Sequence, residues 1–403
     1  MATLPWVVLA ASALLLHEYL AARAVANGRR VVYMRRALLL LALGAVVVIG
    51  PTIQSRVSEA WKARPPRAVP FDSSGDPLAV RALEEQSPEH PFPVNGSRAD
   101  ADAWRARILD ALAARADLAF VRQPAPTNVA FTAADAEMVG TIRRTLIRFA
   151  ASDGTPIPAY VLDPGGAARK GGVLVIPGHG PGIAATSGLR PGYEHSAALE
   201  MARRGYVVLT PELRGFGMLS PSRNATHRLV AAAALAAGSS YKALVARDLQ
   251  RALTVLQEWP GVDPGRLAVT GTSLGGELAV LMGALDERVR VTVSNSYGGA
   301  IGATRENERL DDESRQTPHG CHTMPGINRI LRQEDWVRLI APRPVLVVRG
   351  DRNMSRQTPE FKRLVSLAFE SHGVASHFDV TITPGRHEFF VDPTEAFIAR
   401  WLQ

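Results

Sequence analysis

The sequence predicts an α/β domain in which helices cover both faces of a doubly wound, mostly parallel sheet. Short apolar runs typical of strands alternate with amphipathic segments typical of helices from residue 99 to the C-terminus. The apolar runs, such as VLVIP and VLVVR, are continuous, as expected of strands that are buried on both sides. Ligands of such sheets bind at the carboxyl ends of the strands, so the chemistry is expected in the loops after them.

The elements can be assigned in order along the chain. A helix is expected over residues 99–116, where Trp104, Ile108 and Leu112 recur at helical spacing. Two strands joined by the turn residues SDG come next in residues 141–164. Further strands are predicted at GGVLVIP, YVVLTPEL, RLAVTGTS, VRVTVSNSY, PRPVLVVRG and HFDVTITPG. Helices are predicted at EHSAALEMARRG, YKALVARDLQRALTVLQEW, LGGELAVLMGAL, PEFKRLVSLAFESHG and PTEAFIARWLQ.

The charge and cysteine content exclude some functions. The formal net charge is +8, but the basic residues are scattered, without an aromatic-interleaved stripe or zinc-finger spacing. We therefore expect no nucleic-acid partner. The single cysteine, Cys321, cannot form an intrachain disulfide, so cysteine usage does not indicate a compartment.

The N-terminal residues 1–55 are expected to anchor the protein in a membrane. Two apolar runs, residues 4–16 and 37–53, flank a cluster of arginines, and the second run gives about 25 Å of helix. Positive charge stays on the cytoplasmic side, so the chain beyond residue 55 is expected to face the periplasm or the exterior. One uncleaved helix, a two-helix hairpin and a long cleaved signal remain open. The proline-rich residues 56–98 are predicted to form an extended linker, and residues 99–403 to form the α/β domain.

Ser273 is the predicted nucleophile. The stretch GTSLG fits the Gly-x-Ser-x-Gly pattern and lies between a predicted strand and a predicted helix, which is the context of a nucleophile elbow. The glycines permit a strained turn and a close approach of helix to strand. The alternative is a glycine turn with a purely structural role.

A general base and two oxyanion donors are predicted from neighbouring loops. His387 comes after the last predicted strand, in the chain order expected for a serine hydrolase of this type. One oxyanion donor is the backbone N–H of Leu274, and the second is expected from the PGHGPG loop, at the N–H of His179. The third triad member is predicted to be Asp351, the first residue after the strand PVLVVRG, with Asp379 and Glu388 as alternatives.

These residues together resemble the α/β-hydrolase superfamily, and more narrowly its acetyl xylan esterase and dienelactone-hydrolase-like branch. The resemblance covers residues 99–403 and rests on VIPGHGPG, ARRGYVVLTPELRGFG, ARDLQRALTVLQEWPGVDPGRLAVTGTSLGG, HGCHTMPG and LIAPRPVLVVRGD. It implies a serine esterase that needs no cofactor and acts on a small-molecule or carbohydrate ester.

Two positions depart from the family pattern. The family usually has a histidine where Pro177 stands, and its acid usually stands where this chain has Asn353. Either Asp351 replaces that acid, or the asparagine orients the histidine, or activity is impaired.

The resemblance also implies that the segment HGCHTMPG shapes the substrate pocket through His319, Cys321 and His322. These three residues lack a fourth ligand at the usual spacing, so no metal site is predicted. The sequence thus predicts a membrane-anchored serine esterase. A serine peptidase of the same fold and a hydrolase-fold scaffold without turnover are the alternatives.

Overall fold

The computed structural model describes residues 87–220, 226–296, 320–353 and 358–402. Contacts divide the chain into two units, Met1–Pro77 and Leu78–Gln403, and only the second contains described residues. The expected membrane anchor and most of the proline-rich linker lie outside them. Among the described residues no single helix is long and apolar enough to cross a bilayer. Two consecutive helices together would have the required length and composition, but the chain bends by 108° between them.

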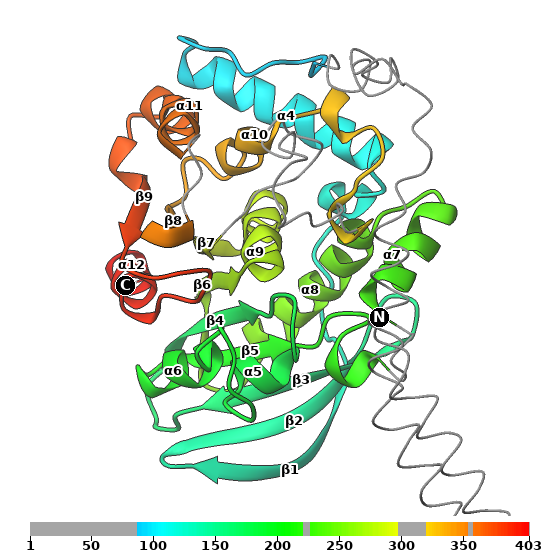
Figure 1. The fold of residues 1–403 in the computed structure, drawn as a ribbon, viewed down its shortest axis with the longest axis vertical. Helices are drawn as coiled ribbons and strands as arrows, with labels where there is room; N and C mark the ends of the chain where they lie inside the picture. The colour runs from blue at the N-terminus through cyan, green and yellow to red at the C-terminus, as the bar shows by residue number, and fades with distance from the viewer. Residues whose placement is uncertain (1–86, 221–225, 297–319, 354–357, 403) are drawn as a thin grey trace, which may run out of the picture. The chain divides into compact units, whose positions relative to one another are not determined.

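The described part of the second unit is built on a nine-stranded sheet with the order β1-β2-β3-β5-β4-β6-β7-β8-β9 (Figure 1). The strands are β1 (Phe131–Val139), β2 (Ile142–Ala150), β3 (Pro156–Asp163), β4 (Lys170–Ile176), β5 (Val207–Pro211), β6 (Val262–Thr272), β7 (Val289–Asn295), β8 (Val345–Gly350) and β9 (Phe378–Thr383). The first three strands and β5 pair antiparallel, and the pairs from β5 to β9 are parallel. The predicted mostly parallel sheet is therefore observed as a mixed sheet.

Helices cover both faces of the sheet, as predicted. They are α4 (Arg98–Arg115), α5 (Ile183–Thr186), α6 (Ala197–Arg203), α7 (His227–Ala236), α8 (Tyr241–Gln257), α9 (Leu274–Leu285), α10 (Gln333–Arg338), α11 (Thr358–Ser371) and α12 (Val391–Trp401). Within β4, Leu174 and Ile176 belong to a core with α8 and α9, whereas Val173 and Val175 belong to a second core with α6 and α12. This alternation places a separate apolar core on each face.

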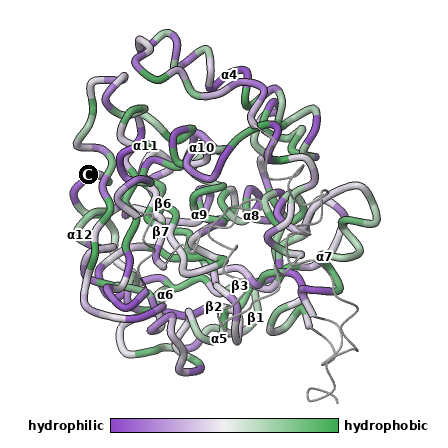
Figure 2. Tube along the Cα trace, turned by 45° about the horizontal axis from the view of Figure 1, so that its top comes forward, coloured by the Kyte–Doolittle hydropathy of each residue, from purple (hydrophilic) through white to green (hydrophobic). Residues whose placement is uncertain are grey.

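The burial of α9 is the most complete among these helices. Each of its twelve residues is buried, and its trace is largely hydrophobic in colour (Figure 2). Its one carboxylate, Glu277, pairs with the equally buried Lys242 of α8. Burial alone would raise the pKa of Glu277, but Lys242 and His322 hold that pKa below its ordinary value.

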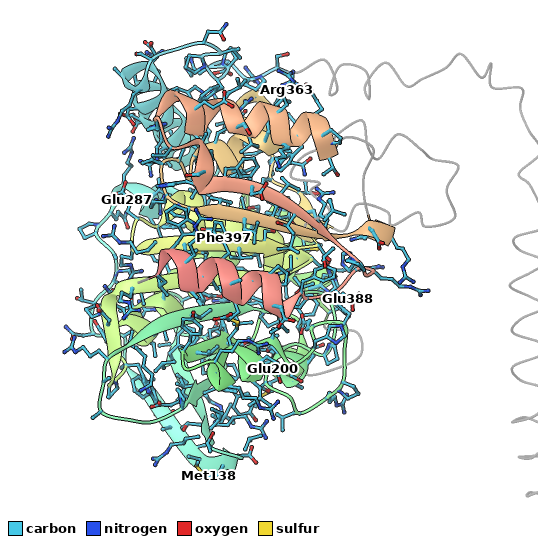
Figure 3. The ribbon with its side chains drawn as sticks, turned by 90° about the vertical axis from the view of Figure 1, so that its left-hand side faces the viewer. Met138, Glu200, Glu287, Arg363, Glu388 and Phe397 are labelled. Carbon is cyan, nitrogen blue, oxygen red and sulfur yellow. The ribbon has the colours of Figure 1, made fainter. Side chains whose placement is uncertain are left out.

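The edge strand β1 was not among the predicted elements. Its sequence FTAADAEMV has few β-branched residues, and its pairing with β2 is interrupted between Ala133 and Ala136. Met138 remains 61% exposed at this edge (Figure 3). Figure 3 also places Glu388 beyond the carboxyl end of β9, at the opposite end of the strands from Glu287.

The bend between β6 and α9 depends on three glycines. A Cβ atom at Gly275 would lie 2.0 Å from the carbonyl oxygen of Ile176, and one at Gly271 would lie 2.5 Å from the same oxygen. A Cβ at Gly276 would meet the carbonyl oxygen of Asn295 at 2.7 Å. The glycines are therefore required because α9 begins against the backbone of the two neighbouring strands.

Replacing Gly275 by alanine should test this close approach. We expect Gly275→Ala to lower the free energy of unfolding by about 1–3 kcal/mol, because the new methyl group meets backbone and cannot be accommodated by a side-chain rotation. Urea unfolding of the full-length protein measures the change. Gly265→Ala is the matched control, since a Cβ there would make only an ordinary 3.4 Å contact with Asp263. Equal stability of Gly275→Ala and the wild type would contradict the steric argument.

Candidate active site

Loops from the carboxyl ends of four strands enclose one cavity of about 600 Å³. Ser273 comes after β6, His387 after β9, Asn353 after β8 and His179 after β4. The cavity is lined by His179, Tyr193, His227, Arg228, Ser273, Asn353 and His387. The structure therefore brings the predicted nucleophile and the predicted base to the same space.

Ser273 lies at the bend itself, with φ 59° and ψ −120°. This conformation is costly for a residue with a side chain, and such strain is characteristic of functional positions. The bend is fixed on both sides, because Ser273 N–H donates to Asn295 O and Ser273 O accepts from Glu277 N–H. Burial raises the pKa of the neighbouring Tyr193, and the Ser273 side chain opposes that rise.

His387 stands beside these groups at the edge of the cavity. Its ring centroid lies 5.6 Å from that of Tyr193. Within the described residues no hydrogen bond links Ser273 Oγ directly to His387. Catalytic hydrogen bonds are often long without substrate and shorten in the complex. His387 remains accessible to solvent, but the protein beside its ring displaces part of the water and lowers the pKa of His387 below its ordinary value, because desolvation disfavours the imidazolium.

The partner of His387 is Asn353, whose Nδ2 lies 3.0 Å from His387 Nδ1. The two loops are packed tightly, because a Cβ at Gly350 would lie 2.4 Å from Arg386 O. An amide therefore occupies the place at Nδ1 where a triad acid would be expected.

The structure does not bring the predicted acid, Asp351, to the ring. Asp351 Oδ1 accepts from the backbone N–H of Gly385 at 3.0 Å, and its side chain is 50% exposed. The reason is local: Asp351–Asn353 form a turn of 3-10 helix that presents Asn353, two residues later, to His387. The alternatives are also engaged elsewhere, since Glu388 pairs with His195 and Asp379 with Lys362.

The loop after β4 is held from two sides. Tyr193 OH donates to His179 O at 2.8 Å, and the backbone N–H of Gly178 donates to Glu194 Oε1. Glu194 is 2% exposed, and its Oε2 has no hydrogen-bond partner among the described residues. Burial and the neighbouring Glu212 raise the pKa of Glu194 to about 7, although the Gly178 hydrogen bond opposes them.

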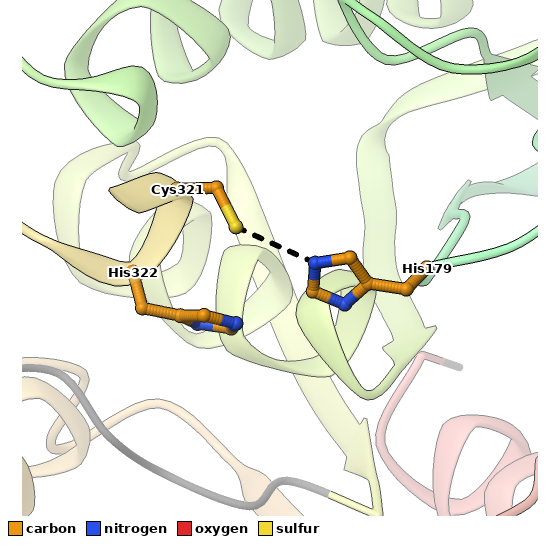
Figure 4. A group of neighbouring side chains, drawn as sticks. All are labelled: His179, Cys321 and His322. Atoms are coloured by element: carbon orange, nitrogen blue, oxygen red, sulfur yellow. Dashed lines mark hydrogen bonds between the residues drawn. The ribbon is translucent and has the colours of Figure 1, made fainter. Parts of the chain in front are cut away.

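The side chain of His179 packs in a cluster that the sequence prediction did not include. Its Nε2 lies 3.4 Å from Cys321 Sγ, and its ring lies 5.3 Å from that of His322 (Figure 4). Cys321 and His322, predicted to shape the pocket, therefore support its wall from behind His179. The third predicted pocket residue, His319, lies outside the described residues.

Three cavity residues were missed by the sequence interpretation: Tyr193, His227 and Arg228. Tyr193 precedes the short helix α6 and reaches His179 across the loop. The other two stand at the start of α7, a helix that was not predicted. No local pattern marks these positions, because their role depends on tertiary contacts.

Known proteins share this fold and part of this sequence. The model of the dienelactone hydrolase family matches residues 157–322. "Putative hydrolase YtaP" of Bacillus subtilis (strain 168) is 26% identical over 212 residues, which cover 50% of this chain and 67% of that protein.

Solved structures give the same fold. A "putative acetyl xylan esterase" of Bacteroides fragilis NCTC 9343 has a TM-score of 0.64 and 19% identity, covering 80% of this chain and 84% of that chain. A glucuronoyl esterase from Solibacter usitatus has a TM-score of 0.57 and 18% identity, covering 79% and 96%. The family and its neighbours support an enzyme that hydrolyses ester bonds. The described residues therefore have the fold of these solved structures, and residues 157–322 match the model of the dienelactone hydrolase family.

Proposed function

We propose that this protein hydrolyses carboxylic esters with Ser273 as nucleophile and His387 as general base. The observation that carries the proposal is the strained bend at Ser273, which opens into the same cavity as an imidazole held at Nδ1. Nucleophilic ester cleavage requires a serine and a base that can come within hydrogen-bond reach, and a strained serine that shares its cavity with a histidine supports such a reaction.

In the proposed reaction, Ser273 Oγ attacks the ester carbonyl carbon while His387 Nε2 accepts the hydroxyl proton. For this step the Ser273 hydroxyl must come within hydrogen-bond reach of His387 Nε2. The backbone N–H groups of Leu274 and His179 stabilise the oxyanion, the first aided by its place at the N-terminus of α9. His387 then protonates the leaving alcohol, and water hydrolyses the acyl-enzyme by the same route.

Asn353 takes the orienting role in this proposal. A basic Nε2 requires the proton of His387 to be on Nδ1, which must then donate to an acceptor. The 3.0 Å contact brings the Asn353 amide to Nδ1, and a half turn of that amide presents Oδ1 there as the acceptor. The amide can fix the tautomer, but it carries no charge to stabilise the imidazolium.

The substrate class is inferred from the relatives. Acetyl xylan and glucuronoyl esterases are named for esters of carbohydrates, and we propose a small acyl ester on a carbohydrate or other alcohol for this chain. We further propose that residues 1–55 tether the enzyme to a membrane with its catalytic domain on the non-cytoplasmic side. The apolar run of residues 37–53 and the arginines before it support this orientation.

A scaffold without turnover is the second candidate function. Asn353 favours it, because replacing the triad aspartate of a serine protease by asparagine lowers kcat by roughly 10⁴. Labelling by a fluorophosphonate separates the two candidates, since only an activated Ser273 reacts.

The kinetic prediction concerns four variants of the full-length protein assayed with p-nitrophenyl acetate. Ser273→Ala should abolish turnover. Asn353→Leu should lower kcat about tenfold or more, because Nδ1–H loses its acceptor, whereas Asn353→Asp should raise kcat by a similar factor through its charge. Asp351→Asn should change kcat less than about twofold, since its amide oxygen can still accept from Gly385 N–H.

These variants also distinguish the alternatives. A strong loss of kcat in Asp351→Asn, together with an unchanged kcat in Asn353→Leu, would indicate that Asp351 is the triad acid. Full activity in Ser273→Ala would contradict the proposed mechanism, and cleavage of peptides in preference to esters would favour a peptidase.

The pH dependence of kcat/KM provides a separate prediction. His387 must be neutral to accept a proton, and burial lowers its pKa, so activity should fall in acid with a midpoint below pH 6.5. Asn353→Asp should move that midpoint to higher pH, because a carboxylate favours the imidazolium. Glu194→Gln, which removes a neighbouring group with a pKa of about 7, is the control and should keep the midpoint. A midpoint that disappears in Glu194→Gln would assign the titration to Glu194.

The membrane orientation can be measured in intact cells. We expect protease added outside the cytoplasmic membrane to cleave the catalytic domain, because the arginines hold the N-terminal side in the cytoplasm. A variant in which Arg29, Arg30, Arg35 and Arg36 are replaced by glutamine should lose this uniform orientation. Protection of the catalytic domain from the protease until the cytoplasmic membrane is permeabilised would contradict the proposal.

A further inference from the structure

Three side chains that bind soft metal ions converge behind the wall of the active-site cavity. Single ligand atoms of His179, Cys321 and His322 all lie within 4.8 Å of one another. The sequence separates His179 from Cys321 by 142 positions, and for that reason the spacing of HGCH alone did not predict a site. In Figure 4 a ring nitrogen of each histidine is turned toward the space between the three side chains.

We propose that His179, Cys321 and His322 bind one Zn²⁺ ion through one atom each, with a fourth position left for water or another ligand. Imidazole and thiolate are the ligands that zinc prefers, and sites with three protein ligands keep one position open. This inference stands apart from the proposed ester hydrolysis and does not depend on it.

The distances are compatible with tetrahedral coordination. Zinc–nitrogen and zinc–sulfur bonds place the two ligand atoms roughly 3.5 Å apart at a tetrahedral angle. The observed distance between His179 Nε2 and Cys321 Sγ is 3.4 Å. With all three atoms already within 4.8 Å, a movement of about 1 Å by the His322 ring would close the site.

The groups behind His322 prepare it as a ligand. Its Nδ1 lies 2.6 Å from Glu277 Oε2, so the carboxylate fixes the ring and leaves Nε2 as the ligand atom. A carboxylate behind a zinc-binding histidine is a common arrangement that increases the basicity of the ligand. Glu277 is held in turn by Lys242, whose Nζ also donates to His322 O at 3.0 Å.

Coordination would replace the present hydrogen bonds. Cys321 is fully buried, and its side chain is hydrogen-bonded to both histidines. Binding of Zn²⁺ requires the thiolate and neutral imidazoles, so the thiol proton and any proton shared with the His322 ring pass to solvent. The positive ion then lies between the thiolate and the Nε2 atoms of the two histidines, while His322 keeps the proton on Nδ1 that it donates to Glu277.

The single cysteine makes a direct test possible. We expect the full-length protein, purified in detergent and treated with a chelator, to bind one Co²⁺ per chain with a thiolate-to-cobalt charge-transfer band in the near ultraviolet. Since Cys321 is the only cysteine in the chain, that band reports on this site alone. Zn²⁺ should displace Co²⁺ and remove the band.

Variants locate the ligands. Cys321→Ser should abolish the charge-transfer band. In competition with a chromophoric chelator, His179→Gln and His322→Gln should weaken Zn²⁺ binding at least tenfold. In the same assay, Glu277→Gln should weaken Zn²⁺ binding about 10–100-fold. His377→Gln, in the loop before β9, is the control and should bind as the wild type does. Circular dichroism verifies that each variant is folded.

Two results would overturn the proposal. One is a folded wild-type protein that shows no charge-transfer band at stoichiometric Co²⁺. The other is Zn²⁺ binding that is unchanged in the folded Cys321→Ser and His322→Gln variants, which would place the ion elsewhere. Loss of esterase activity in Ser273→Ala, with zinc binding retained, would separate this site from the catalytic one.

Discussion

The contact between the first turn of α9 and the backbone of β4 is the constraint on which the site depends. With Gly275 against Ile176 O there is no space for a side chain, so the chain can leave β6, reverse its direction at Ser273 and begin a helix within one residue. The same proximity brings the loop of His179 next to the hydroxyl. The proposed nucleophile and the proposed oxyanion loop are therefore positioned by one backbone-to-backbone contact, and flexible side chains do not set their separation.

The neutral partner of His387 separates two tasks that a carboxylate performs together. An amide at Nδ1 can orient the ring and select its tautomer, but only a negative charge stabilises the imidazolium that forms during the reaction. Partial desolvation lowers the pKa of the His387 ring that Asn353 contacts, and no charge at Nδ1 restores it. The site is suited to a base that is neutral at rest.

Most of the sheet could be predicted from the sequence because its central strands are continuous apolar runs with glycine-rich ends. The bend at Ser273 and the place of His387 are encoded in such local patterns. The edge strand β1 could not be recognised, because FTAADAEMV lacks the composition of a strand and pairs only at the sheet edge. Asp351 was the predicted partner of His387 and Asn353 an alternative; the sequence could not choose between them, since the 3-10 turn at Asp351–Asn353 decides which side chain faces the ring. Tyr193 and the His179 cluster were missed because long-range packing alone brings them to the cavity.

Glu277, which forms a buried ion pair with Lys242, connects three parts of the protein. Glu277 donates its N–H to Ser273 O, while its carboxylate holds Lys242 and His322. One residue thus joins the catalytic bend, the helix beneath it and the chain segment behind the cavity. A displacement of Glu277 at any one of these places would therefore be transmitted to the other two through its own contacts.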